Sequence, residues 1–409
     1  MWTTLLSLVL CSSLSAGCED HARHQDTKKW TQEELAELQV KWGKGEQWGF
    51  AGIASFAHLD HVECLTDPGI DYDIAIIGIP FDTAVSFRPG ARFGPRAIRQ
   101  ASARQIAFRA FNPRAGINPY SNWAKIVDCG DIPVTPFDNG IAQKQMTQAL
   151  KQLGKSKTFS GRITKPKLVI LGGDHSLSLP ALRAINDVYG KPVRVLHFDA
   201  HLDTWNPKAY PSYWGATQFT HGSMFWMARQ EGLMPNSSSA PSVHAGLRTR
   251  LSGTDWTDNE ADGAQNWVRF SADDMDDMGG AKAVAEAIMG ILGSEDPVYL
   301  SVDIDVLDPA FAPGTGTPEP GGWTMRELIR VLRRLEGLNV VGADVVEVAP
   351  AYQGVGEETA LAAAQVVYEV LTSMVKRELK EGESDRATMM KTASIIDSAA
   401  SAAGVRDEL

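Results

Sequence analysis

The sequence predicts an α/β protein, a single three-layer domain with a mostly parallel, doubly wound sheet. Short apolar runs alternate with longer helical patterns, and no repeat or linker interrupts residues 60–380. Such alternation of strand and helix is typical of a parallel sheet. The runs are mostly apolar and do not alternate strictly, as expected of strands that helices cover on both faces. A chain of 409 residues is long enough for one large domain of this class.

Five apolar runs, rich in valine, isoleucine and leucine, are the predicted strands. They comprise residues 74–79, 167–171, 193–198, 297–302 and 340–348. β-Branched and aliphatic residues favour a pleated, buried surface, and each run is too short for a buried helix.

Six longer segments have the spacing of amphipathic helices. They comprise residues 95–105, 141–153, 179–189, 281–292, 325–335 and 359–379. Thr324 and Glu327 have the spacing of a capping box, which predicts the start of one helix. Pro95 lies at the first turn of another, where the missing N–H of proline is tolerated.

Both ends of the chain have the pattern of targeting signals. A short apolar core at 5–10 and a run of small residues at 12–17 are typical of a secretory signal peptide. The last four residues, RDEL, differ by one letter from the ER-retrieval signals KDEL and HDEL. We therefore expect a protein of the secretory pathway, in the ER lumen or secreted. The predicted segments are a signal peptide at 1–17, an N-terminal extension at 18–60, a catalytic domain at 61–380 and a tail with the retrieval-like end at 381–409.

The charge of the chain limits its partners. A formal net charge of −11 argues against nucleic acid or an anionic membrane, because both select basic surfaces. Beyond residue 18, no apolar run approaches the roughly 18 residues that span a bilayer. We expect a small-molecule substrate, with no nucleic acid and no membrane as partner.

The cysteines predict one disulfide at most. If Cys11 leaves with the signal peptide, Cys18, Cys64 and Cys129 remain, and no two of them have metal-ligand spacing. The sequence leaves open whether Cys64 and Cys129 pair. A single glycosylation sequon begins at Asn236.

Four of the predicted strands end in clusters of carboxylate and imidazole side chains. These are Asp174 and His175, then Asp199, His201 and Asp203, then Asp303, Asp305 and Asp308, and finally Glu347. The carboxyl ends of parallel strands line one crevice, so these groups can converge. Bare carboxylates gathered there would repel one another and be costly to desolvate, and divalent cations remove that cost. Four aspartates and two histidines suit Mn²⁺ or a similar metal and fit two ions that share carboxylates.

These motifs resemble those of the ureohydrolase family, which contains arginases, agmatinases and related hydrolases. GGDHS, DAHLD, THG, SVDIDVLDP and EVAPAY stand in the family's order, as does RPGARFGPRAIR at 88–99. The resemblance covers residues 81–352 and implies the arginase/deacetylase fold. It also implies two Mn²⁺ ions per subunit and a homo-oligomer, trimeric or hexameric.

The resemblance assigns roles to the site residues. His175 and Asp203 would hold one Mn²⁺, His201 and Asp305 the other, and Asp199 and Asp303 would bridge the two. Asp203 would also orient the nucleophile and pass its proton to the leaving nitrogen. His221 would be the outer proton shuttle, and Glu347 would pair with the guanidinium of the substrate.

Within the family, the chain is most similar to the agmatinase branch, of which RPGARFGPRAIR is typical. We expect hydrolysis of agmatine to putrescine and urea, with a water activated by two cations attacking the guanidinium carbon. Trp205, Tyr213 and Trp214 would receive the cationic tail by cation–π contact or pack under their loop. Lys208 favours an acidic alternative such as 4-guanidinobutanoate. A catalytically idle scaffold is a third hypothesis, but it would lack a metal ligand, and none is missing.

The remaining candidates have structural interpretations. His197 lies within a predicted strand and is expected in the core. His244 is interpreted as a strand residue near the pocket, with no assigned chemistry. Arg88, Arg92 and Arg96 are expected to hold a loop or a subunit contact and not to touch substrate.

Overall fold

The computed structural model describes residues 30–42, 49–67, 69–209 and 219–379. The chain divides into two units at Gln47, and the first of them contains helix α1 (Gln32–Trp42). The predicted signal peptide and the RDEL tail lie outside the described residues, and the domain boundaries stay predictions. In the described part, no helix has the length and apolar character needed to cross a bilayer.

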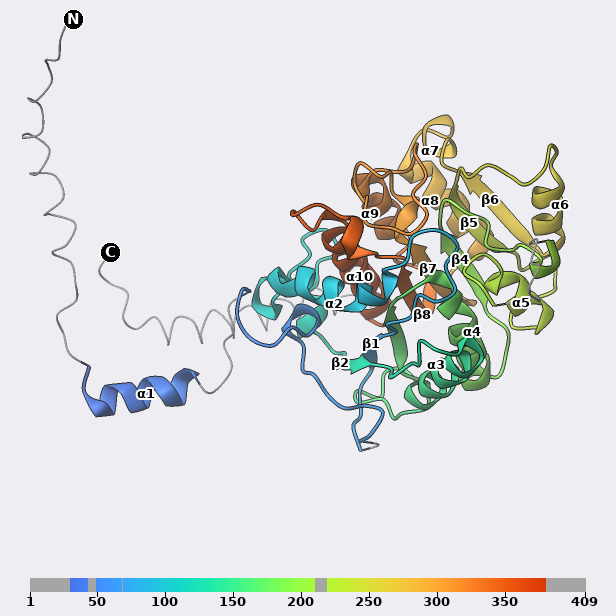
Figure 1. Ribbon diagram of the computed structural model, residues 1–409. Helices are drawn as coiled ribbons and strands as arrows, with labels where there is room; N and C mark the ends of the chain where they lie inside the picture. Colours follow the sequence, from blue (N-terminus) through green and yellow to red (C-terminus); the bar gives the residue numbers. More distant parts are fainter. Residues whose placement is uncertain (1–29, 43–48, 68, 210–218, 380–409) are drawn as a thin grey trace, which may run out of the picture. The chain divides into compact units, whose positions relative to one another are not determined.

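The second unit is built on one sheet of eight parallel strands (Figure 1). The strands are β1 (Ile74–Gly78), β2 (Ile126–Asp131), β3 (Lys167–Leu171), β4 (Arg194–Phe198), β5 (Ser242–Leu247), β6 (Trp267–Ser271), β7 (Pro297–Asp303) and β8 (Asn339–Val346). Their order in the sheet is β2-β1-β3-β8-β7-β4-β5-β6, and every pair is parallel. The predicted α/β class with a doubly wound, parallel sheet is confirmed.

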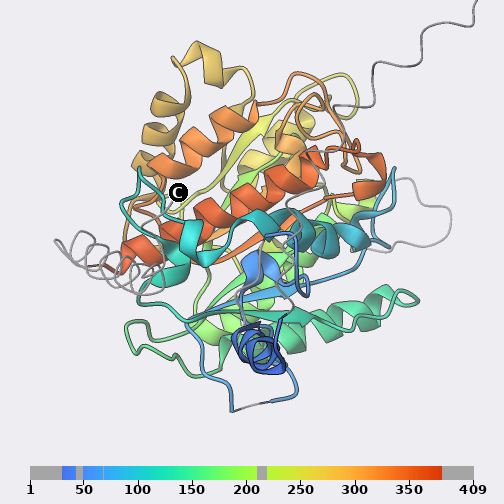
Figure 2. The same ribbon diagram turned by 90° about the vertical axis from the view of Figure 1, so that its left-hand side faces the viewer.

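Helices cover both faces of this sheet. One layer contains α2 (Gly94–Ala101), α8 (Ala281–Leu292), α9 (Met325–Arg334) and α10 (Glu358–Arg377), and the other contains α3 (Asn139–Gly154), α4 (Ser178–Tyr189) and α5 (Met224–Gln230). Alternate residues of β1 belong to different cores: Ile74 and Ile76 pack in the first layer, and Ala75 and Ile77 in the second. Figures 1 and 2 show α10, in red, beside the cyan α2.

The five predicted strands and six predicted helices are present, with ends that differ by a few residues. The capping box of Thr324 and Glu327 begins α9, as predicted. Three strands, β2, β5 and β6, were not predicted. Two of them, β2 and β6, are edge strands with half-exposed or exposed positions, and β5 contains serine, histidine and glycine. Such strands lack the continuous apolar run that marks the centre of a parallel sheet.

Cys64 and Cys129 form a disulfide between the segment before β1 and the edge strand β2. The bond closes a loop with a sequence separation of 65 residues, and closing such a loop lowers the entropy of the unfolded chain. We expect the unfolding free energy of the double variant Cys64→Ser/Cys129→Ser to be lower than that of the oxidised wild-type protein, by about 4 kcal/mol. Urea unfolding of the variant and the oxidised wild-type protein measures this loss. Equal midpoints and slopes for the two proteins would contradict the prediction.

Candidate metal centre

Four ligand atoms converge at the carboxyl ends of β3, β4 and β7. His175 begins a 3₁₀ turn after β3, and its Nδ1 lies 3.1 Å from Asp199 Oδ2 and 3.1 Å from Asp203 Oδ2. Asp303, the last residue of β7, places its Oδ2 at 3.2 Å from the same nitrogen. The four side chains are buried. Residues far apart in sequence meet here because their strands are near neighbours in the sheet.

A second group of ligand atoms adjoins the first. His201 Nδ1 lies 3.1 Å from Asp199 Oδ1 and 3.1 Å from Asp305 Oδ2. Asp199 thus directs one oxygen into each group, which is the geometry of a bridging carboxylate. Asp303 directs only Oδ2 to the first group, since its Oδ1 accepts the N–H of Asp305 at 2.8 Å. The bridging role of Asp303 stays a prediction.

The hydrogen bonds of His175 fit a cation at this point. Its Nε2 lies 2.7 Å from Ser301 Oγ, and that hydroxyl donates to Asp344 Oδ1 at 2.7 Å. Ser301 therefore accepts from Nε2–H, which leaves a lone pair on Nδ1. Nδ1 is buried without a hydrogen-bond partner and faces three carboxylates. A lone pair among anions is stabilised when a metal ion lies between them, and Ser301 orients the ring as outer partners of metal ligands do.

The electrostatics of the centre also favour cations. Burial raises the pKa of Asp303 well above its ordinary value, and the charges of Asp305 and Asp199 raise it further. Burial and the charge of Asp199 raise the pKa of Asp305 to about 6. The carboxylates therefore destabilise one another as anions, and bound dications would stabilise the charged forms. His175 and the aspartates are buried, His201 is half-buried, and these side chains form two adjoining groups, each suited to hold one metal ion.

His221 and Glu347 form a pair beside the centre. His221 Nδ1 lies 3.1 Å from Glu347 Oε1, an oxygen that also accepts the N–H of His175 at 2.9 Å. Burial disfavours the imidazolium, but the hydrogen bond and charge of Glu347 outweigh burial and raise the pKa of His221 to about 9. The N–H of Ser86 points at Nε2 at 3.1 Å and favours the neutral ring. These opposed contacts suit a group that takes up and releases a proton.

The other oxygen of Glu347 has no partner. Oε2 is buried, and among the described residues nothing donates a hydrogen bond to it. A buried carboxylate oxygen without a donor is costly, and a guanidinium N–H would satisfy it.

A pocket of about 780 Å³, including its open mouth, lies above the metal centre. Its lining comprises Ser86, His201, Asp203, Trp205, His221, Gly222, Ser252, Asp303 and Thr317. Trp205 lies in this wall, and its buried indole N–H has no partner among the residues that the structure describes. Tyr213 and Trp214, predicted near the same wall, lie outside the described residues. Lys208 is exposed and is not part of the lining.

Two aspartates from the predicted clusters, Asp308 and Asp174, stabilise turns. Asp308 accepts the N–H groups of Ala310, Gly321 and Gly322 and therefore stabilises a turn outside the centre. Asp174 caps the 3₁₀ turn of His175 through Ser176.

The arginines of the RPGARFGPRAIR segment lie outside the lining of the pocket above the metal centre. Arg92 forms an ion pair with Asp82 and so holds a loop, as expected. Arg88 lies over the ring of Tyr352 at 5.0 Å, and Arg96 is exposed.

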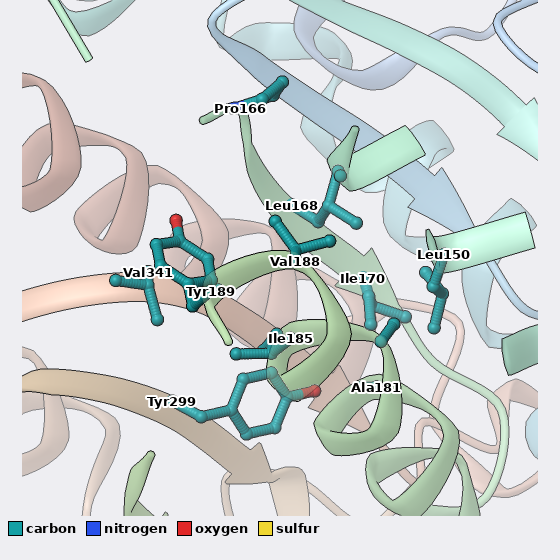
Figure 3. A pocket seen from close by; sticks show the side chains of 13 residues that line it. Leu150, Pro166, Leu168, Ile170, Ala181, Ile185, Val188, Tyr189, Tyr299 and Val341 are labelled. Atoms are coloured by element: carbon teal, nitrogen blue, oxygen red, sulfur yellow. The ribbon is translucent and has the colours of Figure 1, made fainter. Parts of the chain in front are cut away.

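A second pocket, shown in Figure 3, lies between α3, α4 and the sheet. Its wall is formed by aliphatic side chains such as Leu150, Ile170 and Ile185, together with Tyr189 and Tyr299. The residues that line it include no carboxylate and no imidazole, the groups that form the metal centre.

The sequence interpretation missed the residues that orient the ligands. Ser301 lies two residues before Asp303 on β7, so alternation along the strand was a signal for it. Asp344 on β8 had no such signal, because only the neighbouring position of β7 and β8 brings it to Ser301. Ser252 and Thr317 of the pocket lining come from loops whose sequences contain no motif.

Comparison with known proteins agrees with this fold and site. The sequence model of the arginase family matches residues 72–372, and the chain therefore belongs to the arginase family. It is 46% identical over 348 residues to "Putative agmatinase 3" of Schizosaccharomyces pombe, covering 82% of this chain and 83% of that protein. It is 37% identical over 342 residues to the agmatinase of Chromobacterium violaceum, covering 83% and 94%.

A solved structure supports the same conclusion. The proclavaminate amidino hydrolase from Streptomyces clavuligerus superimposes with a TM-score of 0.68 and 37% sequence identity, covering 80% of this chain and 99% of that one. The predicted membership of the family and the predicted fold are confirmed.

Proposed function

We propose that this protein is a hydrolase of amidino C–N bonds that cleaves agmatine to putrescine and urea, using two Mn²⁺ ions. The observation that carries the proposal is the pair of adjoining His/Asp groups that share Asp199 at the base of a pocket. Oxygen and nitrogen ligands without cysteine suit Mn²⁺. Relatives that are 37–46% identical over most of their length are named agmatinases.

The residues of the chain divide the work of the reaction. Bound dications supply a nucleophile at neutral pH, because they lower the pKa of water. Glu347 accepts a guanidinium N–H at Oε2 and turns the guanidinium carbon toward the centre. Asp203 receives the proton of the attacking water at its carboxylate and passes it to the leaving nitrogen. His221, as the outer proton shuttle, protonates the departing amine and returns to the neutral ring, in which the N–H of Ser86 donates to Nε2. The hydroxyl proton that is lost when urea forms goes to solvent, from which His221 regains its proton.

One observation favours a second substrate. Within the described part of the chain, the buried indole N–H of Trp205 has no acceptor, and the carboxylate tail of 4-guanidinobutanoate would provide one. The aromatic face of the same indole suits the ammonium tail of agmatine. The two candidates differ in the charge of the tail and can be separated by assay.

A substrate panel tests the function. Urea release by the Mn²⁺-loaded full chain is measured with agmatine, arginine and 4-guanidinobutanoate. We expect the highest kcat/KM for agmatine, with putrescine in equal amount to urea. A higher kcat/KM for 4-guanidinobutanoate would identify that compound as the substrate and contradict agmatine. No urea from any of them by a protein that contains two Mn²⁺ ions would favour the scaffold hypothesis.

We further propose that the protein is a homotrimer or homohexamer. The proposal follows from the family resemblance, and the subunit number is measured by light scattering on the eluted protein. A monomer that is active would contradict it.

We also propose that the protein folds in the secretory pathway. Disulfides such as Cys64–Cys129 form in oxidising compartments. Asn236, the acceptor of the sequon, is exposed in the loop between α5 and β5.

Glycosylation at Asn236 is therefore expected in eukaryotic cells that express the full chain with both ends. Treatment with an N-glycosidase should increase the electrophoretic mobility of the wild-type protein and leave Asn236→Gln unchanged. A wild-type protein that shows no shift and fractionates with the cytosol would contradict the proposal.

A further inference from the structure

A series of buried side chains leads from the metal centre to helix α6 (Thr257–Ala264). His197 Nε2 lies 2.8 Å from Asp199 Oδ2, the oxygen that also faces His175. His197 Nδ1 lies 2.7 Å from His244 Nδ1, and His244 Nε2 lies 3.1 Å from Asp262 Oδ1. His197 and His244 are register partners on β4 and β5. Neither histidine is a solitary core residue, because each uses both ring nitrogens in the series.

A second contact connects Asp262 with another ligand of the centre. Thr204 Oγ1 donates to Asp262 Oδ1 at 2.7 Å, and Thr204 directly follows the ligand Asp203. Asp203 has a φ of +55°, in the left-handed region that is costly for a residue with a side chain. The loop must therefore be held by its surroundings. Gln265, just after α6, adds a hydrogen bond to the carbonyl of Thr204 at 3.0 Å.

Aromatic rings prevent the histidines from turning away. The ring of Trp267 stacks on His244 with centroids 3.8 Å apart and an angle of 16°. Phe225 contacts His197 edge-on at 4.8 Å. The far oxygen of Asp262 accepts from Arg269 Nη1 at 2.7 Å. Asp262 is fully buried, with His244 and Thr204 on the side of the centre and Arg269 on the far side.

We infer from this geometry that Asp262 is a positioning residue of the metal centre. It fixes Asp199 through His244 and His197, and it fixes Asp203 through Thr204. One carboxylate outside the ligand motifs thus sets the orientation of two metal ligands. The inference rests on the metal centre of the proposed function. Loss of such an outer partner typically lowers metal affinity by about 10–100-fold.

The structure also permits a competing role for His197, as a ligand of the metal. His197 lies within reach of a metal bound by His175, Asp199 and Asp203, so it would be a ligand if its Nε2 bound the metal in place of its contact with Asp199. In the observed arrangement its Nε2 faces Asp199 and its Nδ1 faces His244, which fits positioning. The two roles predict different metal stoichiometries.

Two branches lead from Asp262 to the centre, one to Asp199 through His244 and His197 and one to Asp203 through Thr204. Three variants of the full chain separate these branches. Asp262→Ala removes both branches, His244→Phe breaks only the one to Asp199, and Thr204→Val breaks only the one to Asp203. Arg269→Met is the matched control, since it removes the contact of Asp262 that points away from the centre, together with a hydrogen bond to the carbonyl of Asn259. Mn²⁺ affinity is measured by competition with a chelator, together with the melting temperature of the metal-free protein and the values of kcat and KM.

We expect Mn²⁺ affinity to fall about 10–100-fold in Asp262→Ala and by smaller factors in the single-branch variants. Arg269→Met should retain wild-type affinity. In the Asp262→Ala background, His244→Phe should have little further effect, because the branch is already broken. If Asp262→Ala does not fold, the two single-branch variants still carry the test.

The outcomes distinguish the inference from the proposed function. A wild-type protein that binds no Mn²⁺ would remove the centre itself and the inference with it. Wild-type binding of two ions, with unchanged affinity in His244→Phe and Thr204→Val, would overturn the inference alone. A lower melting temperature of the metal-free variants at unchanged affinity would indicate a merely structural role and also overturn it. Loss of a whole ion in His197→Phe but unchanged affinity in His244→Phe would identify His197 as a ligand and overturn it too.

Discussion

Replacement of Asp305 by alanine is expected to abolish urea formation, with kcat/KM lower by about 1000-fold or more. Asp305 Oδ2 lies 3.1 Å from His201 Nδ1, and its Oδ1 accepts the N–H of Ala200 at 3.1 Å. The variant loses a ligand of the second group and the contact that holds the adjacent loop. Stabilisation of the transition state by a metal amounts to several kcal/mol, and each 1.4 kcal/mol is a factor of about ten.

Asp308→Ala is the matched control for this variant. Asp308 belongs to the same SVDIDVLDP motif but lies outside the centre, where it accepts the backbone N–H groups of a turn. We expect it to lower stability and to retain two Mn²⁺ ions and most of its activity. Metal content and urea release are measured for both variants. Near-normal turnover in Asp305→Ala, with two ions bound, would contradict the site.

Glu347→Gln is expected to lower kcat/KM by a factor of about 100–1000. The variant keeps the shape of the side chain and removes the charge that faces the guanidinium. Loss of one partner from a buried charged pair costs about 2–5 kcal/mol, which corresponds to this range of factors. Glu357→Gln, at a half-buried glutamate that follows the last strand and contacts Gln100, is the control for the same chemical change and should retain activity.

The pH dependence of Glu347→Gln supplies a second measurement. Glu347 raises the pKa of His221 to about 9, against the opposite effect of burial. Without the carboxylate, the imidazolium loses its main stabilisation and its pKa falls. The imidazolium of His221, which protonates the leaving amine, then loses its proton at a lower pH. The alkaline limb of the activity profile should therefore shift to lower pH, and an unchanged limb would contradict the role of His221.

The centre of the sheet was predictable from local pattern alone. The runs that became β3, β4, β7 and β8 are mostly apolar, since these strands are buried on both faces. Their polar ends stand out because a carboxylate after an apolar strand has few structural reasons to be there. The edge strands β2 and β6 could not be recognised in this way, because each is paired on one side only and contains polar residues.

The fold class, the central strands and the side chains available to bind metal could be predicted from local pattern, because the apolar residues of a strand or helix mark its buried positions. Which distant side chains touch depends on how the elements pack in the folded chain. Strand order and register place Ser301 against His175 and His197 against His244, and the packing of α6 brings Asp262 to the loop of Asp203. These contacts join residues far apart in the chain, and no local pattern encodes the hydrogen bonds between them.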